Sequence, residues 1–120
     1  MARRILVVED NALAAGALQA LFESYGYSVR IADSVEAAID ACANEHADLM
    51  LLDLTLPDGD GLSVLAAAAE MGRLPATTVA LTGHDDPVLT ARCRAAGCRD
   101  VLLKPVPARE LLARTADWLA

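Results

Sequence analysis

The chain has 120 residues, of which 55 % are hydrophobic and only 3 % aromatic, and its 17 acidic side chains outnumber 10 basic ones to give a net charge of −7. This length predicts one domain, residues 1–120. Direct nucleic-acid binding is disfavoured, because it depends on clustered Lys and Arg and on aromatic rings that stack on bases. No apolar run reaches the ~20 residues of a membrane span, and the segment before Glu9 is too short for a signal peptide, so we expect a cytoplasmic protein with no membrane contact.

Strand-like and helix-like segments alternate along the whole chain. Continuous apolar runs at 5–8 and 49–52 predict strands buried on both faces, whereas the alternation at 28–32 predicts an edge strand. Segments 77–81 and 101–103 predict two further strands. After each strand, apolar residues recur at helical spacing, which predicts five helices.

The helices have recognisable faces and ends. The first is predicted to bury Ala14, Ala17, Leu18, Leu21 and Tyr25, and the third to bury Leu62, Leu65, Ala66 and Ala69. Asp33, with Glu36 three residues later, predicts the N-cap of the second helix. Asp86 before Pro87 predicts the start of the fourth, and Pro107 that of the fifth. Three helical patterns end at glycines suited to left-handed C-caps, namely Gly26, Gly72 and Gly97.

The chain contains three cysteines, Cys42, Cys93 and Cys98. They lack the spacing of a zinc site, and an odd number cannot all pair. We interpret them as reduced thiols that act as small hydrophobic residues.

Strict alternation of strand and helix predicts a doubly wound (βα)5 α/β fold, with a five-stranded parallel sheet and helices on both faces. In such sheets ligands bind beyond the carboxyl ends of the strands. Polar side chains follow four of the five strands. They are Glu9, Asp10 and Asn11 after the first strand, Asp53 after the third, Thr82 after the fourth and Lys104 after the fifth.

These side chains form a chemically consistent group. Three clustered carboxylates repel one another unless a cation joins them, and hard oxygen ligands favour Mg²⁺. An aspartate beside such a cation can attack phosphorus and form an acyl phosphate. A lysine and a hydroxyl then donate to the phosphoryl oxygens.

Four motifs in order carry a family resemblance. Segments 5–11, 51–57 with Gly61, 80–83 and 103–105 together resemble the receiver domain of two-component response regulators, in the single-receiver form of chemotaxis regulators. The resemblance covers essentially the whole chain. The expected fold is flavodoxin-like, with strand order 2-1-3-4-5.

The resemblance assigns a role to each matching residue. It makes Asp53 the phosphoacceptor, with Thr82 and Lys104 contacting the phosphoryl group. It implies Mg²⁺ as the cofactor, held by Asp53 and Asp10, by Glu9 through water, and by the backbone carbonyl of Thr55. The peptide bond before Pro105 is expected to be cis.

The resemblance also implies partners. A phosphohistidine on a histidine kinase or histidine phosphotransfer protein would supply the phosphoryl group. The domain would catalyse this transfer and its own slow dephosphorylation, as a signalling receiver rather than an enzyme. It would switch a protein-interaction surface toward a downstream protein target or effector domain, as a monomer or a weak homodimer.

Three positions vary among receivers and set their behaviour. Thr55 and His84 correspond to the two positions that flank the phosphoryl group, although a loop histidine is more often simply solvated. Val101 stands three residues before Lys104, where many receivers carry an aromatic ring that turns inward on activation. A β-branched valine cannot perform that movement.

Two other functions fit the sequence less well. An aspartate-nucleophile phosphatase of haloacid dehalogenase type needs a second Asp two residues after the nucleophile, where this chain has Thr55. A pseudo-receiver scaffold that is not phosphorylated is disfavoured by the presence of Asp10, Asp53, Thr82 and Lys104.

The sequence leaves the surroundings of the domain open. It could act alone, belong to a regulator with an effector domain, or belong to a hybrid histidine kinase. The short distance from Met1 to the first strand favours a stand-alone protein or an N-terminal receiver.

Overall fold

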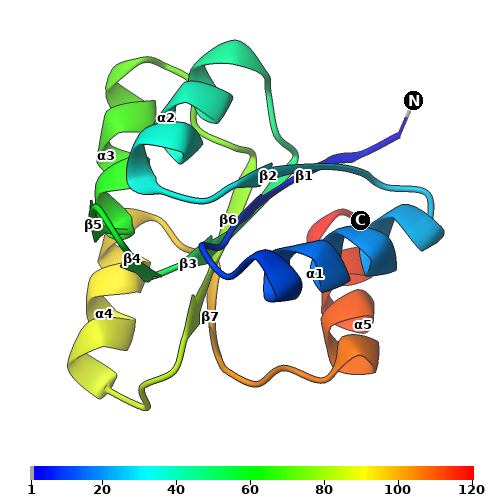
Figure 1. Ribbon diagram of the computed structural model, residues 1–120. Coiled ribbons are helices and arrows are strands. Elements are labelled where there is room, and N and C mark those ends of the chain that lie inside the picture. Colours follow the sequence, from blue (N-terminus) through cyan, green and yellow to red (C-terminus); the bar gives the residue numbers. More distant parts are fainter. Residues whose placement is uncertain (1) are drawn as a thin grey trace.

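Five parallel strands form the central sheet of the computed structural model, which describes residues 2–120 (Figure 1). They are β1 (Arg4–Val8), β2 (Ser28–Ala32), β3 (Leu49–Asp53), β6 (Thr77–Thr82) and β7 (Asp100–Leu103). Their order across the sheet is β2-β1-β3-β6-β7. Because β6 and β7 are the fourth and fifth strands of this sheet along the chain, the predicted order 2-1-3-4-5 is confirmed.

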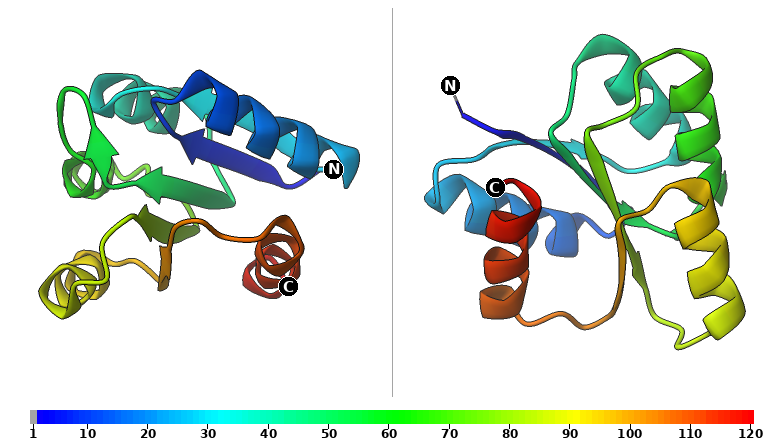
Figure 2. Two further views of the ribbon diagram at one scale, coloured as in Figure 1. Left: turned by 60° about the horizontal axis from the view of Figure 1, so that its bottom comes forward. Right: turned by 180° about the vertical axis from the view of Figure 1, so that it is seen from behind.

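Five helices cover the two faces of this sheet: α1 (Ala12–Ser24), α2 (Val35–Asn44), α3 (Leu62–Glu70), α4 (Pro87–Ala96) and α5 (Ala108–Trp118). Figure 2 shows α2, α3 and α4 on one side, with α1 and α5 on the other. The alternation within β1 explains the layers, since Leu6 and Val8 join the core under α2–α4, whereas Ile5 and Val7 join the core under α1 and α5. Within residues 2–120, no helix is both long and apolar enough to cross a membrane.

The predicted strands are confirmed, with one addition. Residues 49–53 are buried throughout, as expected for a central strand, and β2 lies at a sheet edge. Directly after β3, a short antiparallel pair of strands, β4 (Thr55–Leu56) and β5 (Gly59–Asp60), forms a hairpin that the sequence pattern did not predict.

The predicted faces of two helices are wrong in part. On α1, Ala15 and Phe22 are buried, whereas Ala17 and Tyr25 are exposed. On α3 the buried residues are Val64, Leu65 and Ala68, while Ala66 and Ala69 are exposed. Both helices are rich in alanine around much of their circumference, so hydrophobic spacing alone left their rotation undetermined.

The predicted N-cap of α2 is also wrong by one residue. Ser34, not Asp33, caps the helix, and its hydroxyl accepts a hydrogen bond from the Ala37 amide at 3.0 Å. The amides of the first turn, at Val35 and Glu36, donate to the Asp58 carboxylate at 2.7 and 3.1 Å. Asp58 belongs to the β4–β5 turn, so a residue distant in sequence performs part of the capping that local spacing had assigned to Asp33. Asp86 caps α4 at its start and Gly97 at its end, as predicted. Gly26 and Gly72 have the predicted left-handed conformation, but each lies one residue past the C-cap of its helix, Tyr25 for α1 and Met71 for α3.

Candidate functional site

Four strand ends meet at one edge of the sheet. Glu9 follows β1, Asp53 ends β3, Thr82 ends β6 and Lys104 follows β7. The register pairs Asp53 with Leu81 and Thr82 with Leu103, so these polar residues lie at similar heights on adjacent strands. The four polar residues therefore meet at the sheet edge that the strand pattern predicted.

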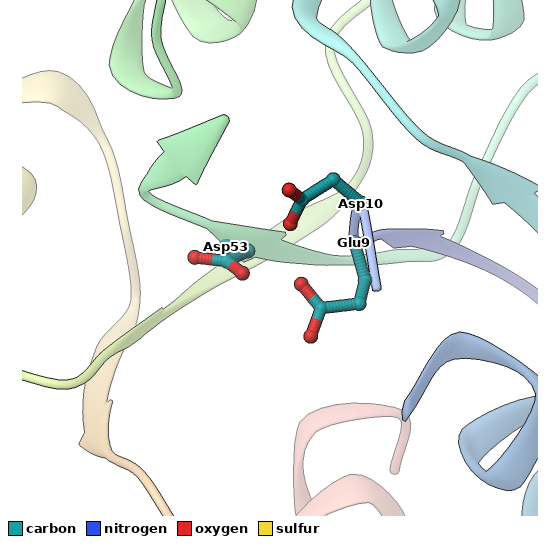
Figure 3. A group of neighbouring side chains, drawn as sticks. All are labelled: Glu9, Asp10 and Asp53. Carbon is teal, nitrogen blue, oxygen red and sulfur yellow. The ribbon is translucent and has the colours of Figure 1, made fainter. Parts of the chain in front are cut away.

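Three carboxylates form what we call the acidic cluster: Glu9, Asp10 and Asp53 (Figure 3). Each offers an oxygen, and these oxygens lie within 4.8 Å of one another. Asp53 and Glu9 are only 6 % and 8 % exposed, whereas Asp10 is exposed. The cluster thus has a buried floor and one open side.

Asp53 is held at both oxygens. Its Oδ2 accepts from the Lys104 ammonium at 2.8 Å, and its Oδ1 accepts from the backbone N–H of Thr55 at 2.9 Å. Burial alone would raise the pKa of Asp53, but the adjacent Glu9, the Lys104 contact and the Thr55 amide together lower it below its ordinary value. The carboxylate is therefore ionised at neutral pH, as a nucleophile must be.

Glu9 has the opposite character. Burial first, and then the neighbouring Asp53, raise the pKa of Glu9 from 4.5 to about 7. Lys104 lies 3.4 Å from Glu9 Oε1, a long contact whose charge offsets only part of this rise. The other oxygen, Oε2, is buried and has no hydrogen-bond partner among residues 2–120.

This orphan oxygen indicates that the acidic cluster fits a cation. A buried carboxylate oxygen without a partner is costly, and a hydrated divalent ion would supply the missing donor through a bound water. The donor set consists of carboxylates, with the nearby backbone carbonyl of Thr55 as a further oxygen. Hard oxygen donors of this kind suit Mg²⁺.

The raised pKa of Glu9 leads to a pH prediction for the metal-free protein. Between about pH 4.5 and 7 the folded state keeps a proton on Glu9 that the unfolded chain has lost, so rising pH favours unfolding. We expect the free energy of unfolding, measured by urea denaturation in EDTA, to fall by about 1–3 kcal/mol across this window. Asp53 does not contribute to the slope in this pH window, because its pKa is lowered from 3.8 and its titration therefore changes the stability only at lower pH. The Glu9→Gln variant should show a flatter profile, and an equal slope in that variant would contradict the assignment.

Thr82 lies at the same edge but faces its own loop. Its Oγ1 accepts from the His84 backbone N–H at 3.1 Å and is 3.5 Å from the His84 carbonyl oxygen. Thr82 is 5 % exposed, whereas the His84 side chain is exposed. Val101, on β7, is half-buried against the core under α2–α4.

Two further residues shape the site. The peptide bond between Lys104 and Pro105 is cis. A Cβ at Gly61 would lie 2.7 Å from the carbonyl oxygen of Asp53 and 3.0 Å from the Cα of Leu54, so a side chain there would push against the segment that carries Asp53. In the sequence Gly61 is only part of a motif, and its steric role becomes visible only in three dimensions.

Comparison with known proteins gives a consistent result. The family model of the response regulator receiver domain matches residues 5–116. The chain is 32 % identical over 119 residues to the TorCAD operon transcriptional regulatory protein TorR of Escherichia coli K12, a match that covers 99 % of this chain and 51 % of TorR. The chain thus spans about half the length of this curated relative.

Two solved structures show the same fold. A CheY-like response regulator receiver domain protein from Methanospirillum hungatei JF-1 has a TM-score of 0.92 and 28 % identity, covering 99 % of this chain and 94 % of that one. The receiver domain of sensor histidine kinase PA1611 from Pseudomonas aeruginosa PAO1, with a magnesium ion coordinated in the active site cleft, has a TM-score of 0.85 and 30 % identity. That match covers 99 % of this chain and 98 % of the other.

Proposed function

This chain belongs to the response regulator receiver domain family of two-component signalling, and we propose that it accepts a phosphoryl group on Asp53 in a Mg²⁺-dependent reaction. The single observation that carries the proposal is the environment of Asp53. An ionised carboxylate lies beside a lysine and two further carboxylates at the ligand-binding edge of a doubly wound sheet.

Mg²⁺ would be held by Asp10 and Asp53, by Glu9 through a water, and by the backbone carbonyl of Thr55. Two observations support this assignment: Glu9 Oε2 has no hydrogen-bond partner in the part of the chain that the structure describes, and all the donors are oxygens. When bound, the ion would offset the charge of the acidic cluster and of the incoming phosphoryl oxygens.

Asp53 supplies the nucleophile. One of its carboxylate oxygens forms a bond to phosphorus while the phosphorus–nitrogen bond of a phosphohistidine breaks, and the imidazole leaves with the electron pair. Lys104 would move its contact from Asp53 Oδ2 to a phosphoryl oxygen. The Thr82 hydroxyl would turn from the His84 backbone and donate to a second one.

The phosphoryl donor would be a phosphohistidine of a histidine kinase or a histidine phosphotransfer protein. The receiver in turn would switch a surface that contacts a downstream protein or an attached effector domain. The length of the curated relative, about twice that of this chain, is compatible with an attached domain.

The test uses the wild-type protein with acetyl phosphate. In millimolar Mg²⁺ we expect a mass increase of one phosphoryl group, located on Asp53 by peptide mapping, and in EDTA we expect none. A non-phosphorylated scaffold would show no increase in either condition. A phosphatase of haloacid dehalogenase type would turn over a phosphomonoester continuously without accumulating the acyl phosphate.

Thr55 and His84 are predicted to lengthen the life of the phosphoryl group. Neither side chain is a carboxylate or an amide, the types best suited to orient the water that hydrolyses the acyl phosphate. The variants His84→Glu and Thr55→Asn should lose the label faster than wild type, by up to roughly 100-fold, the lower end of a general-base effect. Decay is followed in EDTA-free buffer after removal of acetyl phosphate. Unchanged decay in both variants would remove this role.

Because Val101 stands where many receivers carry an aromatic ring, we expect this chain to be activated without the rotation of such a ring. When Thr82 moves toward the phosphoryl group, it must release the His84 amide, so the loop before α4 has to shift. We expect beryllofluoride with Mg²⁺ to change amide chemical shifts from about Thr82 to Ala96, while Val101 keeps one rotamer. Asp53→Asn serves as the control and should show no such change. Shifts confined to the immediate surroundings of Asp53 would contradict the prediction.

A further inference from the structure

The C-terminal end of α4 places two cysteines against each other. The Gly97 amide donates to the Arg94 carbonyl at 3.1 Å and the Cys98 amide donates to the Cys93 carbonyl at 3.0 Å, while Gly97 has φ 110°. These paired bonds form a Schellman motif, in which the residue four positions before the left-handed glycine and the residue directly after it frequently bring their side chains into contact. In this chain, those two residues are Cys93 and Cys98.

Both thiols are buried in the core under α2–α4. Cys93 is 0 % and Cys98 6 % exposed, and both side chains belong to the same buried cluster. Burial raises the pKa of Cys93, and it raises the pKa of Cys98 to about 12, with the neighbouring Cys93 adding to the effect. The third cysteine, Cys42 on α2, is also buried and free; burial raises its pKa, and the charge that partly offsets this rise is that of Arg73, with no thiol involved.

We propose that Cys93 and Cys98 are an oxidisable pair, which a peroxide converts into an intramolecular disulfide across the end of α4. In the first step one thiol reduces a molecule of hydrogen peroxide and becomes a sulfenic acid, with release of one water. In the second step the other thiol attacks that sulfur, a sulfur–sulfur bond forms, and the oxygen leaves as a second water. The peroxide takes up the two electrons, and the two thiol protons leave in the waters.

The burial of the two thiols affects the rate of the first oxidation step, and their closeness affects the rate of the second. Because the thiolate is the reactive form, the raised pKa values make the first step slow compared with an exposed cysteine. The second step is intramolecular, between two side chains that the paired backbone bonds hold at neighbouring positions in one buried cluster, so it outpaces further oxidation of the sulfenic acid. The expected product is therefore a disulfide, formed slowly and without sulfinic or sulfonic acid.

The disulfide would join the last turn of α4 to the residues just before β7. It would close a short loop and restrict the unfolded chain, which stabilises the folded state when the native geometry accepts the bond. The backbone contact already made between Cys93 and Cys98 favours such geometry. This inference does not depend on phosphorylation of Asp53.

The sequence around the pair allows a direct test. After treatment with hydrogen peroxide and alkylation of remaining thiols, trypsin under non-reducing conditions cuts after Arg92, Arg94 and Arg99. This separates Cys93 and Cys98 into two peptides, 93–94 and 95–99. We expect these two peptides to remain linked, with a mass two hydrogens below their sum, and to separate on reduction.

Matched variants make the result specific. Cys42→Ala should keep the linked peptides, whereas Cys98→Ala and Cys93→Ala should lose them. The oxidised wild-type protein should melt roughly 3–10 °C above the reduced one, and the Cys98→Ala variant should show no such shift. Linkage through Cys42, accumulation of sulfonic acid at either residue, or a lower melting temperature after oxidation would each overturn the proposal.

Discussion

Replacing Asp53 by Asn is expected to abolish phosphoryl incorporation from acetyl phosphate in Mg²⁺. The amide oxygen of Asn is not an anionic nucleophile, so no acyl phosphate can form. The replacement keeps the size of the side chain and an oxygen that can accept from Lys104 or from the Thr55 amide, the two donors that hold Asp53 in the structure. The fold should therefore survive, and intact-protein mass spectrometry should show at least a ~100-fold lower labelling rate.

The control for this experiment is Asp117→Asn, at an exposed position on α5 away from the acidic cluster. It should be labelled at the wild-type rate. Labelling of Asp53→Asn at that same rate would mean that another residue accepts the phosphoryl group, and the proposed function would then fail.

Replacing Asp10 by Ala is expected to weaken Mg²⁺ binding strongly. Asp10 is the exposed member of the acidic cluster, and its loss removes a carboxylate ligand. We expect Mg²⁺ affinity to fall by about 100-fold or more, as measured by titration calorimetry. Without metal, the variant should be at least as stable as the wild type, because one of three mutually repelling carboxylates has been removed.

Thermal melts separate these two effects. Millimolar Mg²⁺ should raise the melting temperature of the wild type, since a ligand that binds only the folded state stabilises it. It should leave the melting temperature of Asp10→Ala nearly unchanged. Asp33→Ala, at an exposed position just after β2, is the matched control and should respond as the wild type does. A wild-type melting temperature that ignores Mg²⁺ would contradict the metal site.

Much of the fold follows from the pattern of apolar residues along the chain. The runs at 5–8 and 49–52 lie in strands buried on both faces, and this environment selects continuous apolar sequence. Alternation of strand and helix produces a parallel sheet, because each helix connects two parallel strands of the same sheet. The carboxyl ends of parallel strands lie at one edge of the sheet. The meeting of Asp53 with Lys104 at that edge follows from this topology.

The features that the sequence predicted wrongly, the rotation of α1 and the N-cap of α2, depend on contacts between distant parts of the chain. The rotation of α1 was set by how Phe22 packs under the sheet, because an alanine-rich helix offers several similar faces. The N-cap of α2 was decided by Ser34 together with Asp58 from a hairpin that local propensity did not indicate. The spacing of residues along the chain carries no information about such partners.

The chemistry of the site divides in the same way. By itself, the sequence determined which residue types stand at the strand ends, because strand length and order place them there. Only the tertiary structure decided that Glu9 is buried with one oxygen that has no partner among the described residues, while Asp53 is paired at both oxygens. Lys104 lies 95 positions from Glu9 and 51 from Asp53 along the chain. Because burial and charge act through space, the opposite pKa shifts of Glu9 and Asp53 arise only when the fold brings these segments together.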